Sequence, residues 1–134
     1  ILNGVPPKSI RDIWGVAKIY ETYVGAKKFQ GEEEVFDLIR EAGGEYGSTT
    51  GRPRQVNWLD FDMLKMAARI NGVSKIVLNK MDILEQINSW CLYDGPSLFE
   101  FECRDDIEFW LKSKIKLEVS KDIEVIFSGN KEHI

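Results

Sequence analysis

The chain contains 134 residues, 43% of them hydrophobic and 30% charged, which fits one folded domain and excludes a disordered chain. Eighteen basic residues against 22 acidic ones give a net charge of -4, so composition excludes a global positive field for nucleic acid or an anionic membrane. No apolar run approaches the roughly 18 residues of a membrane span, and no signal segment opens the chain. We therefore expect a single cytoplasmic domain over residues 1–134, with neither nucleic acid nor membrane as a partner.

The cysteines and the histidine limit the metal chemistry. Cys91 and Cys103 are too few for a disulfide scaffold, and His133 is the one histidine, so a Cys/His zinc site is nearly excluded. We interpret both thiols as structural. The chain begins at Ile1 instead of Met, and we expect it to be a fragment of a longer protein.

In the first half of the chain, a helical turn at residues 10–13 is expected to precede one strand over residues 14–23, which are rich in β-branched and aromatic side chains. Apolar residues then recur at helical spacing over residues 32–42, and Gly43 and Gly44 would end that helix. Residues 45–57 have no periodicity, so we predict a loop that contributes no core element.

The second half opens with a well-signalled helix, in which Asp60 is a good N-cap and Gly72 closes the last turn. Within it we expect Met63 and Met66 to fill the core. Another amphipathic helix is predicted over residues 107–115. Buried strands are predicted at residues 74–78, 89–93, 98–102 and 123–127. This alternation indicates an α/β fold with a mainly parallel sheet flanked by helices and a small β-hairpin insertion.

The loop at residues 47–54, GSTTGRPR, combines three hydroxyls, two glycines and two arginines. Each guanidinium can bind a carboxylate or phosphate with two hydrogen bonds, and hydroxyls with main-chain amides can complete an anion site. Pro53 fixes the backbone between the two arginines. The composition suits a small, multiply anionic ligand, and an ordinary surface loop is the alternative.

The second candidate is NKMD at residues 79–82, directly after a predicted strand. A carboxylate there can accept hydrogen bonds from the ring N–H and the exocyclic amine of guanine, while a lysine stem packs over the base. Adenine offers no such pair of donors. A tetrad with one free position also occurs by chance, and the chain has no phosphate-binding loop of the GxxxxGK(S/T) type.

These motifs together closely resemble the C-terminal part of adenylosuccinate synthetase. The matching segments are TYVGA at 22–26, EYGSTTGRPR at 45–54, WxD at 58–60, ARING at 68–72, KxD at 80–82 and IFSG at 126–129. The resemblance implies a P-loop-NTPase-like synthetase fold and an enzyme of AMP biosynthesis that joins IMP and L-aspartate with GTP and Mg²⁺. In that reaction GTP phosphorylates the purine 6-oxygen, and the aspartate amine then displaces phosphate. The complete enzyme is expected to be a homodimer.

The resemblance also implies roles for individual residues. The implied aspartate-binding residues are Ser48, Thr49, Thr50, Gly51, Arg52, Pro53 and Arg54. The implied IMP contacts are Val24 and Arg52. The implied GTP contacts are Arg54, Lys80, Met81, Asp82, Phe127, Ser128 and Gly129. The family's catalytic aspartate and histidine, its phosphate loop and its Mg²⁺ ligands lie in an N-terminal part absent here, so we expect this chain alone to be inactive.

Two alternatives stay open. The sequence departs from the family pattern at Pro53, Gln55 and Asn57, and a viral branch of the family resembles an enzyme that acts on dGMP instead of IMP. The other alternative is a guanine-nucleotide binding module without enzymatic activity, supported by the NKMD tetrad alone. A simple GTP switch, however, has no use for the loop at residues 47–54.

Overall fold

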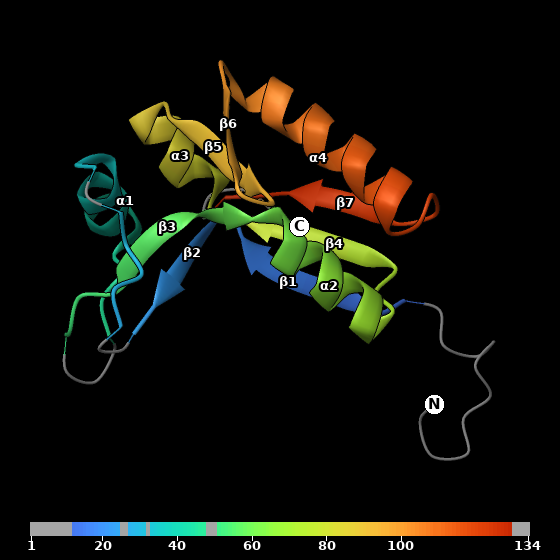
Figure 1. Ribbon diagram of the computed structural model, residues 1–134, viewed down its shortest axis with the longest axis horizontal. Coiled ribbons are helices and arrows are strands. Elements are labelled where there is room, and N and C mark those ends of the chain that lie inside the picture. The colour runs from blue at the N-terminus through green and yellow to red at the C-terminus, as the bar shows by residue number, and fades with distance from the viewer. Residues whose placement is uncertain (1–11, 25–26, 32, 48–50, 130–134) are drawn as a thin grey trace, which may run out of the picture.

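The computed structural model describes residues 12–24, 27–31, 33–47 and 51–129. Within these residues the chain forms two β-sheets and four helices, and the sheets meet near the centre of the molecule (Figure 1). None of these helices combines the length and the apolar character that crossing a membrane requires. The predicted α/β class is confirmed.

One sheet is parallel throughout and has the strand order β1-β4-β7. Its strands are β1 (Trp14–Lys18), β4 (Lys75–Asn79) and β7 (Glu124–Phe127). Lys18 is opposite Asn79, and Leu78 is opposite Phe127, so the three strands end together. Any polar residues that follow these strands are therefore gathered at one edge of the sheet.

The other sheet is mixed, with the strand order β2-β3-β5-β6. Its strands are β2 (Tyr20–Tyr23), β3 (Gln55–Asp60), β5 (Trp90–Asp94) and β6 (Ser97–Phe101). β3 and β5 pair in parallel, whereas β5 and β6 form an antiparallel hairpin. Gly95 turns that hairpin at φ +61°, a backbone conformation that favours glycine. The predicted β-hairpin insertion is confirmed.

The helices are α1 (Val35–Gly43), α2 (Phe61–Asn71), α3 (Met81–Ile87) and α4 (Arg104–Glu118). The Asp60 carboxylate caps α2 by accepting hydrogen bonds from the main-chain N–H groups of Asp62 and Met63. Gly44 and Gly72 end α1 and α2 in the left-handed conformation, as predicted. α1 packs on α3 and β3, while α4 packs on the β5–β6 hairpin.

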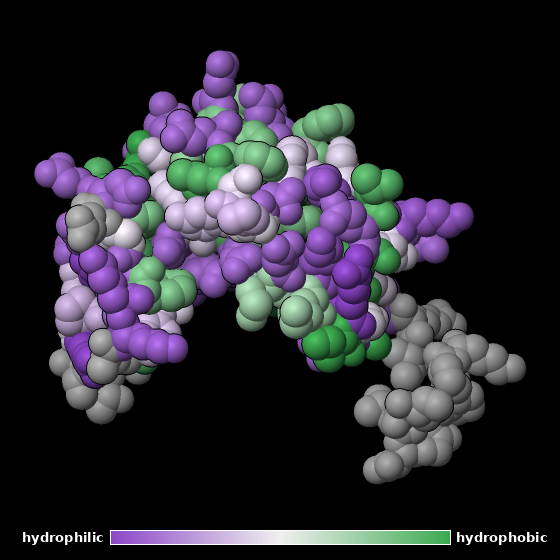
Figure 2. All heavy atoms as spheres, viewed as in Figure 1, coloured by the Kyte–Doolittle hydropathy of each residue, from purple (hydrophilic) through white to green (hydrophobic). Residues whose placement is uncertain are grey.

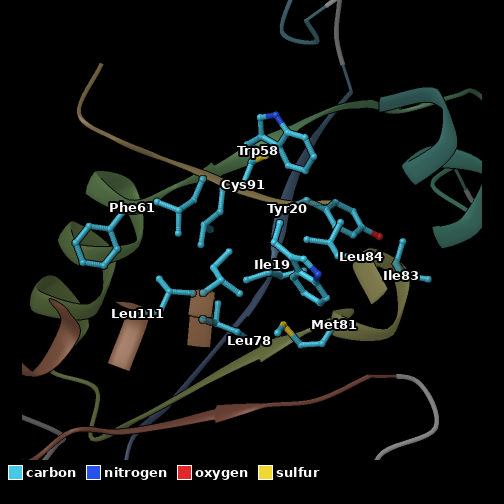
Figure 3. Close-up of a cluster of buried hydrophobic side chains, with 14 of the residues drawn as sticks. Ile19, Tyr20, Trp58, Phe61, Leu78, Met81, Ile83, Leu84, Cys91 and Leu111 are labelled. Atoms are coloured by element: carbon cyan, nitrogen blue, oxygen red, sulfur yellow. The ribbon is translucent and has the colours of Figure 1, made fainter. Parts of the chain in front are cut away.

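One hydrophobic cluster connects the sheets and the helices (Figure 3). Ile19 lies in it between β1 and β2, Leu78 comes from β4, and Phe61 and Leu111 come from α2 and α4. All four side chains are fully buried. Removing apolar surface from water in this way is the main contribution to holding such layers together.

The single strand predicted over residues 14–23 is wrong in one respect, because the chain changes sheets at Ile19. Lys18 is the last residue of β1 to pair with β4, and Tyr20 is the first residue of β2 to pair with β3. The run of β-branched and aromatic residues shows strand preference but not which partner each part will find. Of the helical turn predicted at residues 10–13, only residues 12–13 are described, and they are not helical.

The prediction of a loop through residue 57 is also wrong at its end. Gln55 to Asn57 belong to β3, and the Val56 side chain is fully buried. Polar residues on both sides of Val56 conceal the alternation of this half-buried strand. The short helix α3, which begins directly after the NKMD tetrad's first two residues, was not predicted either.

The prediction that Met63 and Met66 fill the core is wrong as well. Their side chains are 57% and 54% exposed, and α2 buries Phe61 and Ala68 instead. The helix therefore carries apolar residues on two sides, of which only one is covered by the described part of the chain.

Candidate functional site

Three parallel strands deliver polar residues to one edge of the β1-β4-β7 sheet. Lys18 ends β1, Asn79 ends β4, and Ser128 follows β7. The ladder continues past the strand ends, because the Ile19 N–H donates to the Asn79 carbonyl at 3.0 Å and the Ser128 N–H donates to the Leu78 carbonyl at 2.9 Å. The edge is thus rigidly built, as ligand sites at the carboxyl ends of parallel strands are.

The turn from β4 into α3 has an unusual backbone. Lys80 adopts the left-handed conformation at φ +66°, which non-glycine residues rarely occupy. The Met81 N–H donates to the Ser128 carbonyl at 3.0 Å, and this bond ties the turn to the end of β7. Backbone strain of this kind concentrates at functional sites.

Two acceptor atoms in this turn lack partners. Among the described residues, the Asn79 Oδ1 and Asp82 Oδ1 atoms are the buried side-chain polar atoms that make no hydrogen bond. Leaving such an atom unsatisfied costs about 1–3 kcal/mol, and more when it belongs to a charged group. The turn therefore presents two acceptors suited to donors from a ligand.

Gly129 lies directly against the Asp82 side chain. A Cβ atom added at Gly129 would lie 2.8 Å from both the Cβ and the Oδ1 atoms of Asp82, closer than real Cβ contacts allow. The absence of a side chain at Gly129 is thus what leaves room for the Asp82 carboxylate. The structure brings together Lys80, Met81, Asp82, Phe127, Ser128 and Gly129, all of the residues predicted to contact the guanine base.

A buried carboxylate organises the neighbouring loop. Glu45 is only 2% exposed, and it accepts hydrogen bonds from the Tyr20 hydroxyl at 2.5 Å, Lys18 Nζ at 2.9 Å and Arg54 Nη1 at 2.8 Å. Burial alone would raise the pKa of the Glu45 carboxyl, but these three donors outweigh it and the pKa is lowered. Glu45 is therefore ionised at neutral pH and holds Arg54 in place.

Tyr20 links this cluster to the NKMD turn. Burial raises the pKa of Tyr20 strongly, the hydrogen bond to Glu45 adds to the effect, and the nearby Asp82 carboxylate raises the pKa further. The Tyr20 ring belongs to the core, and its hydroxyl points out of the labelled cluster (Figure 3). The two loops that sequence analysis treats separately thus face one region of the molecule.

The loop at residues 45–54 is closed by main-chain hydrogen bonds between its two arms. Arg54 N–H donates to the Glu45 carbonyl at 3.0 Å, and Gly47 N–H donates to the Arg52 carbonyl at 2.7 Å. Pro53 pairs with Tyr46 in an isolated β-bridge, and Gly51 has φ +69°. The predicted aspartate contacts Ser48, Thr49 and Thr50 lie outside the described residues.

Val24, the predicted IMP contact, is exposed at the end of β2. Tyr23 pairs with Gln55 across the antiparallel β2–β3 ladder, so Val24 and Arg54 are the next residues along each strand. The structure therefore places the predicted IMP contact at the same end of this ladder as the arginine loop.

Two residues that depart from the family pattern have structural partners. The Gln55 side chain accepts from the N–H groups of Phe29 and Gln30 and donates to the Lys27 carbonyl. Asn57 donates to the Phe29 carbonyl at 2.9 Å. Both side chains fasten residues 27–30 to β3, which explains them without a change of substrate.

Sequence analysis missed Lys18, Tyr20 and Glu45 as site residues. Glu45 was seen only as the first letter of a family motif, and no local pattern predicts that its side chain is buried beside two cations. Across the residues that the structure describes, no group of three or more His, Cys, Asp or Glu side chains could hold a metal ion.

A parallel sheet with polar, partly strained turns at its carboxyl edge defines an α/β protein of the ligand-binding kind. Residues 1–92 match the family model described as adenylosuccinate synthetase. The chain therefore belongs to the adenylosuccinate synthetase family.

Individual relatives agree with this assignment. The chain is 40% identical over 124 residues to adenylosuccinate synthetase 2, chloroplastic, of Oryza sativa, and 37% identical over 149 aligned positions to the Caldicellulosiruptor bescii synthetase. These matches cover 87% and 98% of this chain. The fold matches a solved structure of fully ligated adenylosuccinate synthetase from Plasmodium falciparum, with a TM-score of 0.57 and 35% identity over 75% of this chain.

The matches leave most of each relative uncovered. The chain spans 25% of the rice relative, 34% of the Caldicellulosiruptor bescii relative and 26% of the Plasmodium falciparum chain.

Proposed function

We propose that this chain forms the C-terminal aspartate- and GTP-binding portion of an adenylosuccinate synthetase. The complete enzyme would join IMP and L-aspartate, with GTP hydrolysis, to form adenylosuccinate for AMP synthesis. In this proposal the enzyme acts as a cytoplasmic homodimer, although relatives named as chloroplastic exist.

The observation that carries the proposal is the pair of unsatisfied oxygens on Asn79 and Asp82. Guanine presents two neighbouring donors, its ring N–H and its 2-amine, whereas adenine has an acceptor at the ring position. The Asp82 carboxylate can accept both guanine donors. Gly129 allows the close approach of this carboxylate, and the Lys80 stem is positioned to pack over the base.

The arginine loop is proposed to hold the dicarboxylate substrate. Arg52 and Arg54 can each bind a carboxylate with two hydrogen bonds, and the hydroxyls of Ser48, Thr49 and Thr50 can complete the site. Glu45 supports this role because it fixes Arg54 from a buried position and neutralises part of the local charge. The ladder end at Val24 is proposed to meet the IMP ribose through its main chain, with Arg52 beside it.

Catalysis is proposed to depend on residues outside this chain. The catalytic aspartate and histidine and the phosphate-binding loop have no counterpart in the printed sequence, so the isolated chain should be inactive. Bound Mg²⁺ would neutralise phosphate charge during transfer. We assign no ligand of this chain to Mg²⁺, because the described residues gather no suitable group.

The alternatives are less well supported. The dGMP-type synthetase was suggested by Pro53, Gln55 and Asn57, and two of these residues have the structural explanation given above. A guanine-binding module without enzymatic activity would leave the Glu45–Arg54 arrangement without a purpose.

Nucleotide titration of the ¹⁵N-labelled chain tests the proposal. GTP should shift the amide signals of residues 79–83 and 127–129 in NMR spectra, and ATP at the same concentration should not. Equal shifts with both nucleotides would show that the NKMD turn does not select guanine.

A further inference from the structure

Helix α2 has two apolar faces, and the described chain covers one of them. Phe61 and Ala68 are buried against the rest of the fold. On another side of the helix lie Met63, Met66 and Ile70, and the Ile70 side chain is 75% exposed. Exposed apolar residues at successive helical turns are unusual on a monomer surface and mark interaction sites.

A groove runs beside this exposed face, between α2 and strands β1 and β2. It consists of two adjoining hollows of about 160 Å³ and about 390 Å³, which share Ala17, Leu64 and Ala67 in their walls. Figure 2 shows apolar side chains gathered over α2 on this side of the molecule. The groove is thus shaped and apolar enough to receive another packed element.

Strand β1 forms one border of the groove and lies at the edge of its sheet. Within the described residues β1 pairs with β4 alone, and its Val16 side chain is exposed. An edge strand with apolar side chains invites pairing with a further strand or cover by a helix. We refer to Val16, Met63, Met66, Ala67 and Ile70, together with the groove, as the α2 face.

We propose that the α2 face docks the part of the synthetase fold that residues 1–134 do not contain. This inference rests on the proposed function. The relatives are three to five times as long as their matches to this chain, since those matches cover 20–34% of their length. A core-like face on so partial a unit fits a surface that becomes interior in the whole enzyme.

The position of the groove gives the docking a functional consequence. Lys18, Glu21 and Thr22 line the same hollow as Met63 and Leu64. Lys18 also contacts Glu45, which holds Arg54. A segment seated on the α2 face therefore lies next to the proposed substrate site and can bring the missing catalytic groups to it.

Methionine oxidation provides a direct test with an internal control. Met63 and Met66 are exposed, whereas Met81 is completely buried. Peroxide should oxidise the first two and spare Met81 in the isolated chain, as mass spectrometry of peptides would show. Co-expression with the complementary fragment, meaning the residues of the Caldicellulosiruptor bescii relative outside its match to this chain, should lower the oxidation rates of Met63 and Met66 to that of Met81.

Matched variants locate the surface. Met66→Lys and Ile70→Glu should abolish capture of the complementary fragment while the circular dichroism of the isolated chain stays unchanged, because both side chains are exposed. Phe109→Glu changes a residue that is 74% exposed on α4, outside the α2 face, and should leave capture intact. A chimera that carries residues 1–134 in place of the matching stretch of the relative gives the same oxidation measurement within one chain.

The outcomes separate this inference from the proposed function. Oxidation of Met63 and Met66 in both the co-expressed complex and the chimera as fast as in the isolated chain would overturn the docking. Protection by high concentrations of the isolated chain alone would assign the face to a second copy and also overturn it. Guanine selectivity in the NMR titration does not involve the α2 face, so its loss would overturn the proposed function while leaving protection unaffected.

Discussion

The Tyr20 hydroxyl donates a 2.5 Å hydrogen bond to the Glu45 carboxylate, which lies buried between the two sheets. Tyr20 begins β2, and Glu45 follows the end of α1. Lys18, from the other sheet, binds the same carboxylate at 2.9 Å. One ionised side chain therefore joins both sheets to the loop that carries Arg54.

Replacing Glu45 with Gln should destabilise the chain in a pH-dependent way. The variant loses charge-assisted hydrogen bonds worth about 2 kcal/mol in total, at the lower end because Lys18 and Arg54 remain partly hydrated. The folded-state pKa of Glu45 is lowered from 4.5, so its contribution is present above pH 4.5 and is lost as the pH falls below that value.

Urea unfolding at pH 7 and at acidic pH would measure this effect. The difference in unfolding free energy between wild type and Glu45→Gln should shrink as the pH falls below 4.5. Tyr20→Phe is the matched control, since it removes one donor and leaves both cations on the carboxylate, and it should cost less at pH 7. A difference that is constant with pH would show that the Glu45 charge does not stabilise the fold.

Lys80→Gly should separate stability from binding. Lys80 occupies the left-handed region at φ +66°, where a non-glycine residue costs roughly 1–2 kcal/mol. Glycine removes that strain but loses more conformational entropy on folding, about 0.5–1 kcal/mol. We expect stability to be retained or to rise slightly in thermal unfolding, while GTP binding weakens because the lysine stem over the base is gone. A variant that is clearly less stable would contradict the assignment of strain to this turn.

Gly129→Ala tests the contact between β7 and the Asp82 carboxylate. The new methyl group would meet Asp82 at 2.8 Å and must displace it. The GTP-induced NMR shifts at residues 79–83 should therefore diminish. Ser128→Ala is the neighbouring control, because the described interactions of Ser128 in this turn involve its main chain, and it should keep those shifts. Equal responses of the two variants would argue against a site at this position.

The sequence predicted the elements better than it predicted their surroundings. Asp60, Gly44 and Gly72 carry local capping chemistry, and the helix boundaries that depend on them were predicted correctly. The break at Ile19 and the burial of Val56 depend on which strands pair, which is a property of the whole fold. The exposure of Met63 and Met66 was missed for a related reason, because periodicity shows that a face is apolar but not what covers it.

The candidate site divides in the same way. The NKMD tetrad and the IFSG segment are short motifs, and their meeting at Asp82 and Gly129 follows from parallel strands that end together. Glu45 and Tyr20 could not be found from sequence, because a buried carboxylate is recognised only through its partners. The unsatisfied oxygens of Asn79 and Asp82 likewise exist only in three dimensions.

Arg52→Leu should affect the acidic substrate rather than the base. In an active synthetase that contains this chain, loss of a guanidinium removes a charge-assisted contact to an aspartate carboxylate, worth roughly 1.5–3 kcal/mol. The Michaelis constant for aspartate should rise at least about tenfold, since 1.4 kcal/mol corresponds to a factor of ten. The preference for GTP over ATP should stay unchanged. A parallel loss of base preference would show that the two loops do not divide these tasks.

Asp82→Asn should change the base preference itself. The substitution replaces one carboxylate oxygen with an NH₂ group, so a guanine N–H would face another donor. Losing one such hydrogen bond should raise the GTP requirement at least about tenfold, by the same relation between energy and affinity. Xanthine carries an oxygen acceptor in place of the 2-amine, so XTP should be partly restored as a substrate by this variant.

The measurement is steady-state kinetics of adenylosuccinate formation, followed by ultraviolet absorbance, with GTP and XTP in parallel for wild type and Asp82→Asn. Arg52→Leu serves as the matched variant, because it should alter the aspartate constant and leave the ratio of GTP to XTP efficiency unchanged. An unaltered Michaelis constant for GTP in Asp82→Asn would remove Asp82 from the base site. In that case the unsatisfied Asp82 oxygen beside Gly129 would need a different partner, and the proposal that this turn recognises guanine would fail.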